Sequence, residues 1–172
     1  MNITTLALLV LTPLLVWRVY KRLKGMMLRQ RSIVSRHYTG VMVFAAMVLV
    51  AAAELLKQPE VQAALLGCLA LGTVLGIGNG VWGLRLTRFE NDTCYFTPHP
   101  HLGMVVAMAF VARVMYIGVE IYANQGGTTP TPGFTDSPLT MFVLGLMAGY
   151  FGTYSAGLIR WRRGLKQAID QA

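Results

Sequence analysis

The stretch VQAALLGCLALGTVLGIGNGVWGL, residues 61–84, decides the fold class of this chain. It contains no charged side chain, and about twenty helical residues are enough to cross ~30 Å of hydrocarbon. The stretch therefore predicts a transmembrane helix, and its length allows that helix to tilt in the bilayer.

Similar apolar runs lie on both sides of this stretch, which predicts an all-α membrane bundle of about five helices in a single domain, 1–172. The first run lacks the basic start of a cleavable signal peptide and is followed by basic residues, so we expect it to be retained. Pro59 ends the second run in a tight turn. The expected helices are 3–20, 38–56, 61–84, 102–122 and 139–159.

The composition agrees with a membrane protein, because 55% of the residues are hydrophobic and 13% are charged, against roughly 25% charged in soluble domains. The formal charge of +8 does not indicate nucleic acid binding, because the basic residues cluster directly after apolar runs. The two clusters, 18–36 and 160–166, are typical of charges that anchor helices beside anionic lipid.

Basic residues also predict the orientation of the bundle. Thirteen of the fifteen lie on one side of the expected helices, Lys57 lies on the other, and Arg113 lies within a helix. Because loops rich in Lys and Arg stay in the cytoplasm, we expect the N-terminus outside and the C-terminus inside.

Glycines recur at four-residue spacing in two of the expected helices. Gly72, Gly76 and Gly80 lie in the third, and Gly145 and Gly149 lie in the fifth. Small residues at this spacing form a groove that another helix backbone can approach closely. The pattern favours packing within the bundle, and the alternative is a contact between two copies of the chain.

Arg113 is expected eleven residues into the fourth helix, about 16 Å along it. A charge at such a depth costs about 2.5–3.5 kcal/mol on insertion scales, so it needs a partner. Tyr116 and Glu120 share its helical face, Glu54 is a second acidic candidate, and hydroxyls or carbonyls of the third or fifth helix are further ones. The four residues form either a polar site that binds an anion or relays a proton, or a structural lock between helices.

The connection between the third and fourth helices predicts a short cytoplasmic β-hairpin at about 86–97, because alternating residues flank the turn at 91–93. His99, His101 and Cys94 carry metal-ligand atoms, but their spacing matches no established zinc pattern. The two cysteines, Cys68 and Cys94, form no CxxC pair. We therefore expect no metal and no cofactor.

The segment RLTRFE, residues 85–90, resembles the CcdC-like family when taken with Tyr95 and the helix around Arg113. The basic end at 161–163 is similar as well. These are small bacterial multi-pass membrane proteins associated with cytochrome c biogenesis genes, so the resemblance implies an inner-membrane location. By position, the family's recurrent motif corresponds to Arg88, Phe89, Glu90 and Arg113, and this motif is not a known active site.

Three classes of function are compatible with these patterns. The first is a non-enzymatic bundle that assembles with itself or with another membrane protein, in an accessory role linked to cytochrome c or thiol-redox biogenesis. The second is a small transporter or channel that uses the polar residues around Arg113. The third is an enzyme, which the sequence disfavours because it contains no Ser/His/Asp set, no HExxH motif and no paired carboxylates at one depth.

Overall fold

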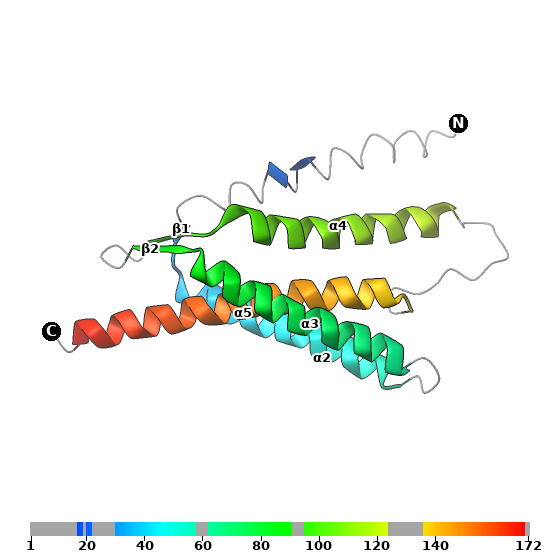
Figure 1. Ribbon diagram of the computed structural model, residues 1–172, viewed down its shortest axis with the longest axis horizontal. Coiled ribbons are helices and arrows are strands. Elements are labelled where there is room, and N and C mark those ends of the chain that lie inside the picture. Colours follow the sequence, from blue (N-terminus) through cyan, green and yellow to red (C-terminus); the bar gives the residue numbers. More distant parts are fainter. Residues whose placement is uncertain are drawn as a thin grey trace.

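A computed structural model describes residues 17–18, 20–21, 30–57, 62–90, 95–123 and 136–170. In these residues the chain forms four long helices and a small sheet (Figure 1). Each helix contains an apolar segment long enough to cross a membrane, so the protein is a helical bundle of the multi-pass membrane type. The helices are α2 (Val34–Leu55), α3 (Gln62–Arg85), α4 (Pro100–Ala123) and α5 (Pro138–Asp170).

These helices correspond to the second to fifth apolar runs, while the expected helix 3–20 lies almost entirely outside the described residues. Two boundaries differ from the sequence expectation by more than two residues. Helix α2 begins at Val34 rather than at residue 38, and α5 continues past residue 159 to Asp170. Hydropathy marks where the apolar segment ends, whereas Arg, Leu, Lys, Gln and Ala continue a helix readily in water.

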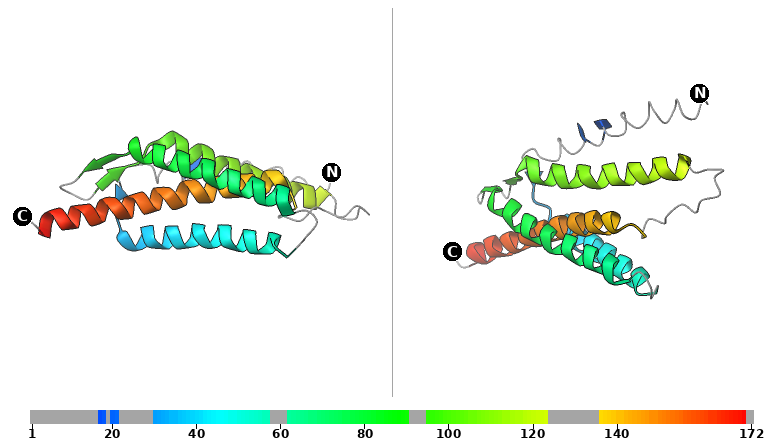
Figure 2. Two further views of the ribbon diagram at one scale, coloured as in Figure 1. Left: turned by 60° about the horizontal axis from the view of Figure 1, so that its bottom comes forward. Right: turned by 45° about the vertical axis from the view of Figure 1, so that its right-hand side comes forward.

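Helix α5 is the central element, because each of α2, α3 and α4 makes its most extensive contact with it. The left view of Figure 2 shows α2 on one side of α5, and α3 and α4 on the other. The α3–α5 contact is the most extensive in the described chain. A buried apolar cluster fills the place where α2, α3 and α5 meet, and it consists of Ala51, Leu55, Leu65, Leu69, Met141 and Leu144.

The contact between α3 and α5 brings the two backbones together at the glycines of α3. A methyl group added to Gly72 would overlap the carbonyl oxygen of Phe142, and one added to Gly76 would overlap that of Leu146. At Gly80 the added carbon would lie 2.9 Å from the carbonyl oxygen of Tyr150. Any side chain on this face of α3 would therefore push α5 away.

The glycines of α5 have the reciprocal position. A carbon added to Gly145 would overlap the carbonyl oxygen of Leu69, and one added to Gly149 would overlap that of Thr73. The two glycine rows thus face each other within one chain, and we call this contact the glycine seam. In lipid, where the hydrophobic effect does not drive helices together, such close approach supplies the packing energy.

The sheet lies at one end of the bundle and contains three short antiparallel strands. Strands β2 (Arg88–Glu90) and β3 (Tyr95–Thr97) pair as the hairpin expected from the sequence. Strand β1 (Gln30–Arg31) pairs with the other edge of β3, which gives the order β1-β3-β2. The sequence did not predict β1, because two residues in a basic segment carry no alternating pattern.

The described basic residues near the ends of the helices lie together at the end of the bundle that holds the sheet. We call this end the sheet end. Helices α2 and α4 start at that end, and α3 and α5 run towards it (Figure 1). Lys57 lies at the opposite end, after α2, and Arg113 lies between the two ends. The residues gathered at the sheet end are Arg36, Arg85, Arg88, Arg160, Arg162 and Arg163.

The glycine seam predicts that a single methyl group weakens the fold at one glycine and not at its neighbour. Gly76→Ala should lower the free energy of unfolding by about 1–3 kcal/mol, as overpacking does in tight interfaces. Gly78→Ala is the matched control, because no atom lies within 4 Å of the added carbon. Reversible unfolding of the purified protein in detergent measures both, and equal stability of the two variants would contradict the seam.

Candidate functional site

The guanidinium of Arg113 joins α4 to the first turn of α5. Its Nε donates a hydrogen bond to Thr140 Oγ1 at 3.0 Å, and its Nη2 donates one to Ser137 Oγ at 2.7 Å. The Thr140 side chain is 1% exposed, so the bond to it lies inside the protein. The Ser137 carbonyl accepts the first backbone hydrogen bond of α5, from Met141.

Tyr116 lies one turn further along α4, on the same face as Arg113. The guanidinium carbon is 5.1 Å from the centre of the Tyr116 ring, a cation–π contact. Such a contact is worth about 0.5–1 kcal/mol at an exposed site and more when it is desolvated. Tyr116 itself is 58% exposed, so its outer side faces away from the bundle.

The two acidic candidates have different positions. Glu54 accepts a hydrogen bond at 2.7 Å from Lys57, in an exposed ion pair at the end of α2. Glu120 is half-buried, about two turns beyond Arg113 on α4. The structure therefore brings Arg113 and Tyr116 together, and it joins them to the hydroxyls of Ser137 and Thr140.

The sequence reasoning covered Thr140 only as an unspecified hydroxyl of the fifth helix, and it did not include Ser137, which precedes the expected helix. The signal that identifies them is the segment SPLT at 137–140, which places two hydroxyls three residues apart at the start of an apolar run. Residues three apart on a helix share a face, so one guanidinium can reach both.

The Arg113 region contains the positive guanidinium and, beside Ser137, the negative carboxylate of Asp136. The hydroxyl partners are neutral, so they solvate the guanidinium without cancelling its charge. The N-terminus of α5, beside them, adds about half a positive charge from the helix dipole. A guanidinium has five N–H donors, and the two hydroxyls take two of them. The arrangement can hold the helices together, and its charge also suits an anion.

The motif of the β2–β3 hairpin lies far from Arg113. Arg88 and Glu90 are exposed on β2, and Phe89 packs against Trp161 of α5 with ring centres 4.7 Å apart. Helix α4 starts beside the sheet, and Arg113 lies thirteen residues after that start, about 20 Å along the helix. The two parts of the motif are thus at separate sites of the molecule.

The two histidines at the start of α4 lie close to each other, with the rings of His99 and His101 5.3 Å apart. The Nδ1 of His99 is buried without a hydrogen-bond partner in the described structure. In the described ranges no group of three or more His, Cys, Asp and Glu side chains could hold a metal ion. Cys94 lies outside these ranges, and Cys68 is a free thiol in α3.

A tyrosine cluster at the sheet end joins three helices. The hydroxyl of Tyr154 lies 2.9 Å from Thr87 Oγ1, and Thr87 also donates to the carbonyl of Gly83 at 2.8 Å. Tyr150 stacks on Tyr154, and its hydroxyl fits between Gly83 of α3 and Gly103 of α4. These contacts satisfy polar groups within the bundle and fix the distance between α3 and α4.

The fold and its internal polar contacts define a small helical membrane protein of the multi-pass class. The family model described as CcdC protein matches residues 1–168, so the chain belongs to that family. The resemblance expected from the sequence motif is therefore confirmed. Searches among curated proteins and among solved structures found no match.

The hydrogen bond between Arg113 and Thr140 predicts that the cost of a substitution at Thr140 depends on the presence of Arg113. A double-mutant cycle can measure this dependence. Thr140→Val should lower the free energy of unfolding by about 1–3 kcal/mol, because it leaves a half-buried charged donor without its acceptor. The same change should cost much less in an Arg113→Met background. Thr39→Val, at an exposed position of α2, is the matched control. Equal costs in both backgrounds would contradict the bond.

Proposed function

We propose that this protein is a non-enzymatic accessory component of a bacterial cytoplasmic membrane. It acts by helix contacts with a second membrane protein or a second copy of itself. The observation that carries the proposal is the outward face of α4, on which the half-exposed phenol of Tyr116 lies within a segment that is long enough to cross the membrane. A phenol facing hydrocarbon loses its hydrogen bonds, whereas a partner helix can supply one.

The surroundings of Tyr116 support this proposal. Helix α4 joins the bundle mainly through α5, and less extensively than α2 or α3 does. Large apolar side chains are exposed along it: Val105, Val114, Val119 and Ile121. Arg113 is bonded to α5 and so serves as a lock that holds α4 in position. A fixed, mainly apolar face with one polar group is suited to binding another helix.

The orientation and the biological setting belong to the same proposal. The sheet end faces the cytoplasm, because the positive-inside rule retains the arginines gathered there. The resemblance of the hairpin motif links the accessory role to cytochrome c or thiol-redox biogenesis. The two cysteines of the sequence, Cys68 and Cys94, form no CxxC pair, so the part of this chain in such a process is to assist a redox partner.

A photoreactive amino acid at Val105 or Val119, introduced into the full chain in native membranes, tests the proposal. We expect a cross-linked product of one discrete larger mass from each of these two α4 positions. The exposed position Met42 on α2 is the matched control, which should give mainly lipid adducts. Lipid adducts or cross-links within the chain at all three positions would contradict the proposal.

The alternative function is a small transporter or channel for an anion at the Arg113 region. The specific observation in its favour is the coincidence of a guanidinium with the N-terminus of α5, which together attract negative charge. The polar site would then include Arg113, Tyr116 and Glu120, with Glu54 at the outer end of α2.

Arg113→Leu distinguishes the lock from the transporter. If Arg113 is a lock, the variant should accumulate several-fold less in membranes than the parent protein, because α4 loses its bonds to α5. If the protein is a transporter, the variant should accumulate normally and lose flux of chloride or phosphate into vesicles. Quantitative immunoblotting and a vesicle flux assay measure the two outcomes. Normal accumulation with lost flux would reject the lock.

A further inference from the structure

We propose that a groove between α2 and α5 binds the headgroup of an anionic phospholipid. The groove has a volume of about 590 Å³ and lies at the sheet end of the bundle. It is separate from the Arg113 region, so this inference is independent of the proposed accessory role. Its walls come from the first turns of α2 and from residues 156–167 of α5, where the apolar run ends and basic residues begin.

The groove changes from apolar to cationic along its length. Its inner part is lined by Val41 of α2 and by Ala156 and Ile159 of α5. On α5, Arg160 and Arg163 follow at spacings that keep them on the same helical face. A surface of this kind matches an amphiphile whose acyl chain lies inward and whose charged group lies outward.

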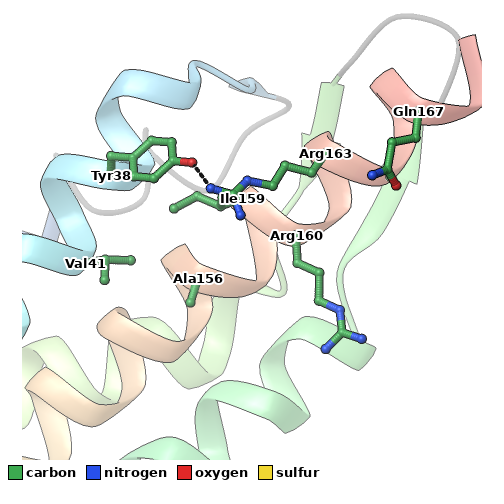
Figure 3. A pocket seen from close by; sticks show the side chains of 8 residues that line it. Tyr38, Val41, Ala156, Ile159, Arg160, Arg163 and Gln167 are labelled. Atoms are coloured by element: carbon green, nitrogen blue, oxygen red, sulfur yellow. Dashed lines mark hydrogen bonds between the residues drawn. The ribbon is translucent and has the colours of Figure 1, made fainter. Parts of the chain in front are cut away.

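Arg163 is held over the groove by Tyr38. Its Nη2 donates a hydrogen bond to the Tyr38 hydroxyl, and its guanidinium carbon lies 5.7 Å from the ring centre. Figure 3 shows Arg163 reaching across to Tyr38, while Arg160 leaves α5 in a different direction. The planar guanidinium group binds phosphate oxygens in pairs, and fixing it beforehand lowers the entropy lost on binding.

The position of the groove favours a lipid over a free phosphate ion. The candidate membrane span of α2 begins at Val34 and that of α5 ends at Leu165, so Tyr38 and Arg163 lie close to the span ends, where headgroups are expected. The described lining contains two guanidiniums and no carboxylate. Each basic residue raises the affinity of such a site for the anionic lipids of a cytoplasmic leaflet by about fivefold.

The test is native mass spectrometry of the full-length protein in detergent, titrated with phosphatidylglycerol or with phosphatidylcholine. We expect the parent protein to retain phosphatidylglycerol at lower lipid concentration than phosphatidylcholine. Arg163→Gln should weaken phosphatidylglycerol binding by about fivefold, and Arg160→Gln/Arg163→Gln by more. Arg85→Gln is the matched control, because it removes one exposed charge from the same end of the bundle.

A second variant separates the groove from general surface charge. Ala156 is exposed, so Ala156→Phe fills the apolar part of the groove and leaves both guanidiniums and the fold in place. It should reduce phosphatidylglycerol binding as much as Arg163→Gln does. An excess of inorganic phosphate should leave the bound lipid in place. Equal losses in Arg85→Gln and Arg163→Gln, unchanged binding in Ala156→Phe, or displacement by phosphate would each overturn the proposal.

Discussion

The close approach of the α3 and α5 backbones is the constraint on which the rest of the structure depends. Four glycines, Gly72, Gly76, Gly145 and Gly149, each occupy a place where a carbon atom would overlap a carbonyl oxygen of the other helix. In hydrocarbon, apolar side chains gain little by leaving lipid for protein, so tight van der Waals packing has to supply the association energy. The glycine seam supplies it along several turns and fixes α5 at the centre of the bundle.

Helix α5 then positions both polar regions of the molecule. Its first turn supplies the hydroxyls of Ser137 and Thr140 that hold Arg113 of α4. Its last turns carry Arg163 to Tyr38 of α2 and form the wall of the groove. One rigid helix thus connects a cation inside the membrane span with the cationic end beside the sheet. A change at the seam would alter both regions together.

The sequence predicted the parts of the structure that follow from long, local patterns. Apolar runs identified α2 to α5 as membrane-spanning helices, and alternation around a turn identified the β2–β3 hairpin. The structure differs from the sequence prediction where a single residue or a very short segment determines the local structure. Strand β1 has two residues, and its pairing with β3 depends on contacts distant in sequence. The hydroxyl partners of Arg113 depend on how α4 and α5 are placed, and the periodicity of the sequence does not contain that information. The contact of Arg113 with Tyr116 and the pairing of Glu54 with Lys57 are local, because each joins residues three apart.

Solid-state NMR of the protein in lipid vesicles tests the glycine seam most directly. Chains labelled with ¹³Cα glycine and ¹³C′ leucine would be diluted in an excess of unlabelled chains, so that any transfer arises within one molecule. The seam predicts a cross-peak between Gly76 Cα and the carbonyl carbon of Leu146 that survives dilution. A cross-peak that disappears on dilution would mean that the glycines join two copies, and it would contradict the account.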